Sequence, residues 1–214
     1  MITVYAFSNV PPPVKGVTRD LRVLWALEET GLAYDISPID GVRGDQRSPA
    51  YQRVNPFGVI PAIEDDGFAL FESGAILSYI ADKTGALGPQ DAKGRALAAQ
   101  WSLAALNTVE PSAIQIFAID KFFPDQSWAK EVRPARVEQT QRWLPTLEAA
   151  LTRQPYLLGE RFSAADILMT SVLRFIQHTD LLSAVPHVAA YKARCEKRPA
   201  FEKVLSDQEA RFGG

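Results

Sequence analysis

Two short segments carry residue types that could together hold a small peptide with a carboxylate group. The first is Ile60-Pro61, and the second is Glu72-Ser73. An X-Pro bond adopts the cis form at little cost, and a cis bond here would turn the main-chain N–H and C=O of Ile60 outward. Such exposed groups can pair with an extended peptide as a short added strand. We therefore interpret Ile60-Pro61 as one wall of a peptide-binding site.

The second segment lies directly before a predicted helix over residues 74–83, with Ser73 as its N-cap. A helix N-terminus offers unpaired N–H groups and partial positive charge, which suit a carboxylate. Glu72 adds an anion that could hold an ammonium group. Taken singly, the two segments are also explained as an edge proline and an ordinary serine cap. Their order and spacing along the chain favour a binding site.

These residues must be positioned by the strands and helices predicted for the first part of the chain. Residues 2–7 alternate as a strand, residues 18–30 have a helical spacing that Gly31 ends, and residues 34–39 form a second strand. A polar loop with one short helix before Asn55 follows, and residues 59–64 and 68–71 are predicted strands. The expected order is β-α-β, loop, β-β-α.

The second part of the chain is predicted to be helical. Residues 85–91 have the composition of a linker, and strand patterns disappear after them. Helical patterns cover residues 92–118, 128–151, 164–177, 186–196 and 200–211. Ser163-Ala164-Ala165-Asp166 fits the form of a capping box at the start of one of them. We predict one domain over residues 1–84, a linker over 85–91 and an all-helical domain over 92–214.

Composition and charge narrow the classes of function. The 214 residues are 47% hydrophobic and carry 23 basic and 25 acidic side chains, a formal charge of −2 that argues against nucleic acid as a partner. No apolar run approaches the ~20 residues that span a bilayer, and no signal peptide is visible. The single cysteine, Cys195, rules out an internal disulfide framework. His178 and His187 show no metal-ligand spacing. We expect a cytoplasmic protein with no metal and no membrane partner.

The chain resembles the cytosolic glutathione transferases over nearly its whole length. The resemblance is carried by residues 22–32 on the first helix, Asn55-Pro56-Phe57-Gly58-Val59-Ile60-Pro61, Phe71-Glu72-Ser73-Gly74 and Ser163-Ala164-Ala165-Asp166-Ile167. It implies an α/β thioredoxin-like N-terminal domain, an all-α C-terminal helical domain, a homodimer and glutathione as co-substrate. By the same resemblance Pro61 is a cis-proline and Ile60 pairs with the cysteinyl backbone of glutathione. Glu72 and Ser73 then take its γ-glutamyl end.

The family reaction needs a glutathione thiolate, and this chain departs from the family where the thiol is activated. A free thiol has a pKa near ~8.5, which a hydrogen-bond donor at the sulfur lowers. The family supplies Tyr, Ser or Cys near the end of the first strand or the start of the first helix. Here a longer loop with Pro11-Pro12-Pro13, expected to be extended, follows Ser8. Ser8 is our preferred donor. Thr18 comes second but is also explained as an N-cap, and Tyr5, Asn9 or a backbone N–H stay open.

The resemblance implies conjugation of the glutathione thiolate to small apolar electrophiles, as in detoxification. The electrophile is expected between the two domains, against aromatic side chains of the helical domain: Trp101, Phe117, Phe122 and Phe123. Two alternatives stay open. One is a binding or interaction protein that has the transferase fold but no catalysis, which the proline-rich loop motivates. The other is a glutathione-dependent peroxidase or isomerase.

Overall fold

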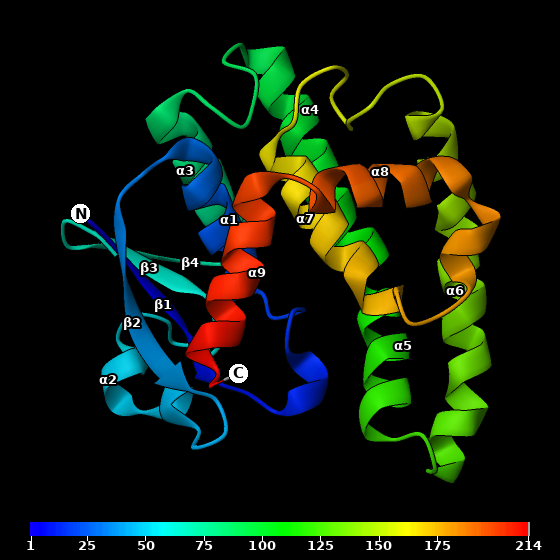
Figure 1. Cartoon of the computed structure of the whole chain (residues 1–214), viewed down its shortest axis with the longest axis horizontal. Helices are drawn as coiled ribbons and strands as arrows, with labels where there is room; N and C mark the ends of the chain where they lie inside the picture. Colours follow the sequence, from blue (N-terminus) through cyan, green and yellow to red (C-terminus); the bar gives the residue numbers. More distant parts are fainter. Residues whose placement is uncertain (214) are drawn as a thin grey trace. The chain divides into compact units, whose positions relative to one another are not determined.

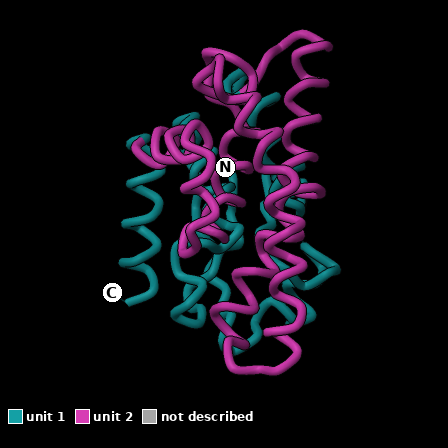
Figure 2. The backbone as a smooth tube through the Cα atoms, turned by 90° about the vertical axis from the view of Figure 1, so that its right-hand side faces the viewer, with its two compact units in different colours: residues 1–87, 198–214 teal, residues 88–197 magenta. Residues whose placement is uncertain are grey.

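The computed structural model describes residues 1–213, and their contacts form two compact units (Figure 2). Unit one contains residues 1–87 together with the chain from Arg198 onward, and unit two contains residues 88–197. No helix in the described part of the chain is long and apolar enough to cross a membrane. The two units are described separately below.

Unit one is built on a four-stranded sheet in the order β2-β1-β3-β4 (Figure 1). Its strands are β1 (Ile2–Asn9), β2 (Tyr34–Asp40), β3 (Ala62–Asp65) and β4 (Phe68–Phe71). β1 runs parallel to β2 and antiparallel to β3, which is antiparallel to β4. The predicted strand and helix order is confirmed. The third strand begins at Ala62 and not at residue 59, which is consistent with proline having no N–H to give to a ladder.

The helices of unit one are α1 (Asp20–Thr30), α2 (Pro49–Gln52), α3 (Ser73–Thr84) and α9 (Pro199–Arg211), with 3-10 turns at Pro12–Val14 and Asp45–Arg47. Gly31 ends α1 in the left-handed conformation at φ +67°, as its position predicted. The expectation that the three prolines are extended is wrong, because Pro12 and Pro13 lie inside a 3-10 turn. Helix α9 packs against α1 within this unit.

The two faces of the sheet carry different layers. Ile2, Val4 and Ala6 alternate along β1 as buried residues, and α1 and α3 contact the sheet and each other. On the other face, Tyr5 and Phe7 join an apolar cluster that includes Tyr51 of α2. The alternation predicted for residues 2–7 therefore separates two layers of core.

Unit two is helical throughout its described elements. These are α4 (Ala92–Leu103), a π-helical turn (Ala104–Val109), α5 (Glu110–Phe122), α6 (Ser127–Leu151), α7 (Ala164–Leu173), 3-10 turns at Arg174–Ile176 and Leu181–Ala184, and α8 (Pro186–Glu196). The helix predicted over 92–118 is interrupted by the π turn, and the one predicted over 164–177 ends as a 3-10 turn. The capping box of Ser163 and Asp166 is confirmed at the start of α7.

Candidate functional site

The strand registers bring the predicted site residues to one end of the sheet. Ala62, the first residue of β3, pairs with Tyr5 of β1 and with Phe71, the last residue of β4. The residues next in line on the three strands are therefore Ser8 near the end of β1, Pro61 before β3 and Glu72 after β4. The N-terminus of α3 follows directly at this same end.

The Ile60-Pro61 peptide bond is cis, as predicted. The turn before it is held firmly, because the Val59 carbonyl accepts hydrogen bonds from the Tyr51 hydroxyl and the Asn55 side-chain amide, both at 2.7 Å. The Ile60 side chain is buried. Among residues 1–213, the main-chain N–H and C=O of Ile60 make no hydrogen bond. These two groups can therefore pair with an added extended segment.

The prediction that Ser73 caps α3 is wrong. The N-cap position belongs to Glu72, whose carbonyl accepts the Ile76 N–H at 2.9 Å, and Ser73 is the first helical residue. Glu72 has φ +70° and ψ +117°, a backbone conformation that non-glycine residues rarely adopt and that is often found at functional sites. Its side chain is exposed. This arrangement leaves the Ser73 hydroxyl free of a capping role.

Arg22 is the main charged residue at this end of the sheet that sequence reasoning did not single out. Its side chain is 1% exposed, and its Nη1 donates to the Ser73 hydroxyl at 3.2 Å. A buried guanidinium and the N-terminus of α3 both favour an anion beside Ser73. The one signal in the sequence is a charged residue within the apolar run from Leu21 to Leu24.

The candidate thiol donors differ in their surroundings. The register of β1 with β2 shifts between Phe7 and Asn9, so Ser8 lies in a bulge, and bulges often re-aim a side chain beside an active site. The Ser8 side chain is half-buried, and its hydroxyl has no hydrogen-bond partner among the described residues. The Asn9 side chain donates to Asp40 at 3.5 Å. Among these residues, the Ser8 hydroxyl is available to a ligand.

The hydroxyls of Thr18 and Tyr5 are already engaged. Thr18 is 9% exposed and accepts a hydrogen bond from Gln208 Nε2 at 2.7 Å. It does not cap α1, whose N-cap position is occupied by Arg19. The Tyr5 hydroxyl donates to Glu64, and burial together with this carboxylate raises the pKa of Tyr5 to about 12. Neither hydroxyl is as accessible as that of Ser8.

The aromatic residues expected near the electrophile all belong to unit two. Phe117 is buried, whereas Phe122 and Phe123 are 41% and 43% exposed. Phe122 is the last residue of α5 and not part of a loop, as had been expected. Trp101 lines a cavity of about 370 Å³ that also has Trp143 in its wall. Their role towards an electrophile stays a prediction.

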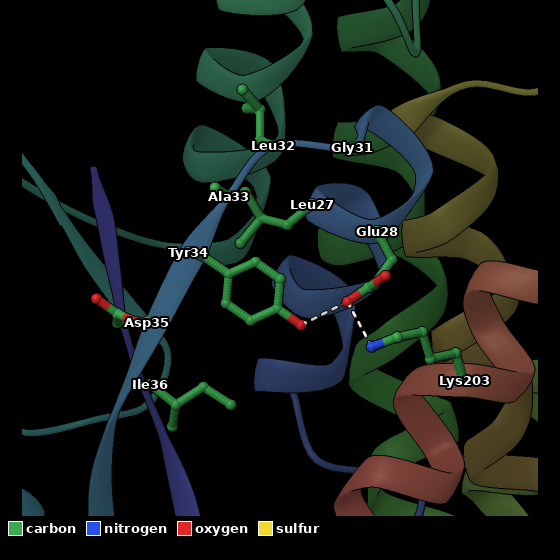
Figure 3. Close-up of a pocket in the computed structure, with 9 residues that line it drawn as sticks. All are labelled: Leu27, Glu28, Gly31, Leu32, Ala33, Tyr34, Asp35, Ile36 and Lys203. Atoms are coloured by element: carbon green, nitrogen blue, oxygen red, sulfur yellow. Dashed lines mark hydrogen bonds and ion pairs between the residues drawn. The ribbon is translucent and has the colours of Figure 1, made fainter.

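A second pocket of unit one lies at the other end of the sheet (Figure 3). It has a volume of about 570 Å³, and Tyr34 in its wall pairs with Ile2 at the start of β1. Glu28 accepts hydrogen bonds from the Tyr34 hydroxyl and from Lys203 Nζ, both at 2.8 Å. Because its polar groups satisfy one another, this pocket does not compete with the site around Ser8. No group of three or more possible metal ligands occurs in the described residues.

Comparison with known proteins gives consistent results. The family model "Glutathione S-transferase, N-terminal domain" matches residues 14–82, and "Glutathione S-transferase, C-terminal domain" matches residues 112–199. Glutathione S-transferase 4 of Zea mays is 33% identical over 190 residues, which are 86% of this chain and 85% of that protein. Probable glutathione S-transferase GSTF2 of Oryza sativa subsp. japonica is 33% identical over 202 residues, 89% of this chain and 91% of that protein.

A solved structure agrees with these relatives. It is a glutathione transferase from Burkholderia graminis with two glutathione molecules bound per protein subunit. It is 34% identical, has a TM-score of 0.84, and the match covers 95% of this chain and 87% of that one.

Proposed function

Because this chain belongs to the glutathione S-transferase family and is a glutathione transferase, we propose that glutathione binds at the sheet end that carries Ser8, Ile60-Pro61 and Glu72-Ser73. The observation that carries this proposal is the strand register, which gathers these three separate segments at one end of the sheet. Glutathione is an extended tripeptide with an ammonium group and two carboxylates. Each of these groups has a matching partner here.

The peptide part of glutathione is held by main-chain pairing and by charge. The N–H and C=O of Ile60 pair with the cysteinyl residue as a short added strand. The γ-glutamyl carboxylate lies at the N-terminus of α3, where Ser73 and its neighbour Arg22 favour an anion. The exposed Glu72 carboxylate then meets the ammonium group. A tripeptide with these charges is fixed in one orientation.

That orientation brings the cysteinyl sulfur towards Ser8. The Ser8 hydroxyl donates a hydrogen bond to the sulfur and stabilises the thiolate, while the thiol proton leaves to solvent. The thiolate then attacks the electrophile, forming a carbon–sulfur bond. A hydrogen bond to a charged group contributes about 1.5–3 kcal/mol, which corresponds to a fall of roughly 1–2 units in the thiol pKa. The engaged hydroxyls of Thr18 and Tyr5 support Ser8 as the donor.

The test is Ser8→Ala, with Ser37→Ala as a matched control on the neighbouring strand β2. We expect Ser8→Ala to bind glutathione normally in calorimetry, to raise the pKa of its bound thiol by roughly 1–2 units and to slow conjugation at neutral pH by about 10–100-fold. Ser37→Ala should change none of these values. An unchanged thiol pKa in Ser8→Ala would assign the donor to another group.

We also propose a small apolar electrophile, a homodimer and a cytoplasmic location. The exposed aromatic side chains of Phe122 and Phe123 support an apolar electrophile. A homodimer predicts a mass in light scattering of twice the 23.6 kDa of one chain. A single cysteine, Cys195, which is buried as a free thiol, is consistent with a reducing compartment.

A further inference from the structure

We propose that Gln208 and Arg211 of helix α9 are positioning residues for thiol activation. They hold the two ends of the segment over residues 8–19, which links β1 to α1 and begins with Ser8. The inference rests on the proposed function in so far as the thiol donor lies in this segment. Helix α9 is the last helix of the chain, and it returns to unit one after the whole of unit two.

Arg211 holds the first end of this segment. Its Nη1 donates to the main-chain carbonyl of Phe7 at 3.2 Å and lies 3.8 Å from the Asp20 carboxylate. The same carboxylate accepts the Phe7 N–H at 3.0 Å. Both main-chain groups of Phe7, the residue before Ser8, are therefore held by charged side chains. One of these comes from the start of α1 and the other from α9.

Asp20 links the two helices at a fully buried position. Its side chain is 0% exposed. Burial raises the pKa of Asp20, and hydrogen bonds from Thr18 and the Phe7 N–H oppose that rise. Arg211, whose side chain is 15% exposed, adds a positive charge that also opposes it. A carboxylate buried this deeply depends on all its donors, so a change at Arg211 is transmitted to Phe7 and to Ser8.

Gln208 holds the second end of the segment. It is 1% exposed, its Oε1 accepts the Gly16 N–H at 2.8 Å and its Nε2 donates to the Thr18 hydroxyl at 2.7 Å. Because Gly16 offers a donor and Thr18 an acceptor, the amide fits in only one orientation. Gln208 thus fixes the path of the chain between the 3-10 turn at Pro12–Val14 and the start of α1.

The position of a hydrogen-bond donor matters more for a reacting sulfur than for stability. A displacement of about 1 Å in a catalytic group can lower a rate by a factor of up to a hundred. Ser8 lies in a bulge, where the ladder itself does not fix the residue. The contacts of α9 supply the constraint that the ladder lacks at this point. Loss of these contacts should therefore change the thiol before it changes binding of the peptide part.

The experiment compares Arg211→Met and Gln208→Met with Lys203→Met, a matched change on the same helix at the other end of the sheet. The probe is glutathione itself, with its Kd from calorimetry and its thiol pKa from ultraviolet absorbance of the thiolate against pH. We expect Arg211→Met and Gln208→Met to raise the thiol pKa and to lower kcat roughly tenfold while the glutathione Kd stays within about twofold. Lys203→Met should leave all three values unchanged.

Conservative variants keep the test valid if a methionine variant fails to fold. Arg211→Lys retains a donor for the Phe7 carbonyl, and Gln208→Glu retains the acceptor for Gly16 while losing the donor to Thr18. We expect Arg211→Lys to recover most of the activity and Gln208→Glu to keep the defect. Folded variants at both positions with a wild-type thiol pKa and kcat would overturn the inference.

The result also separates this inference from the role of Ser8. If Ser8→Ala leaves the thiol pKa unchanged and the α9 variants raise it, the proposed donor is wrong and the positioning role stands. If Ser8→Ala raises the thiol pKa and the α9 variants do not, the positioning role is wrong and the proposed donor stands.

Discussion

The buried carboxylate of Asp166 offers a sharp prediction about stability. Its Oδ1 accepts the Leu157 N–H and the Tyr191 hydroxyl, both at 2.9 Å. Its Oδ2 accepts the Ser163 N–H at 2.8 Å and the Ser163 hydroxyl at 2.7 Å. The side chain therefore joins the start of α7 to α8 and to the segment before α7. Asp166→Ala would remove all four bonds at once.

The size of the effect follows from the donors left behind. The N–H groups of Leu157 and Ser163 and the Tyr191 hydroxyl would each lose a partner, at a cost of about 1–3 kcal/mol per group. Part of this loss is offset, because burial disfavours the charged carboxylate and raises the pKa of Asp166. We therefore expect Asp166→Ala to lower the free energy of unfolding by about 3–5 kcal/mol. Asp166→Asn, which keeps the Oδ1 acceptor but places an amide against Ser163, should lose about 2 kcal/mol.

Urea unfolding followed by circular dichroism at one protein concentration measures these differences. The matched control is Asp207→Ala, because the Asp207 side chain is 51% exposed and pairs with Lys203 on the same helix. An exposed pair of this kind contributes less than about 0.5 kcal/mol. A loss below about 1 kcal/mol in Asp166→Ala, with an unchanged m value, would refute the reasoning, because unpaired buried donors would then cost far less than assumed.

Two further predictions concern ion pairs. Arg133 donates to Asp120 at 2.6 and 2.9 Å and holds the pKa of that carboxyl below its usual value. The stabilisation is present above an ordinary aspartate pKa and is lost as pH falls through the lowered folded-state pKa, so Asp120→Asn should lose less stability than wild type between about pH 6 and pH 3 in urea titrations. Equal acid losses would contradict this. Glu29 accepts from Arg198 at 2.6 and 2.7 Å, and Glu29→Gln should lower the free energy of unfolding by about 2 kcal/mol. Unchanged urea unfolding would show that this pair contributes nothing.

Local patterns predicted most of the fold. The alternation in β1, the stop at Gly31 and the capping box of Ser163 and Asp166 depend on residues a few positions apart, and each is confirmed. The cis bond at Pro61 is also a local feature. The candidate site was predictable to the same extent, since Ile60-Pro61 and Glu72-Ser73 are adjacent elements of one β-β-α segment.

Features that depend on distant contacts could not be predicted in this way. Gln208 and Thr18 are 190 positions apart, and Arg211 and Phe7 are 204 apart, so no local pattern pairs them. The bulge at Ser8 arises from the register with β2, a strand that lies beyond α1. The cap at Ser73 was misassigned because a serine before a helix resembles an N-cap, whereas the Glu72 backbone holds that position.

The most direct test of the central claim is a crystal structure with glutathione bound. We expect the main chain of Ile60 to pair with the cysteinyl residue and the Ser8 hydroxyl to lie within ~3.2 Å of the sulfur. A complex in which Thr18, Asn9 or a main-chain N–H contacts the sulfur, with Ser8 turned away, would contradict the account.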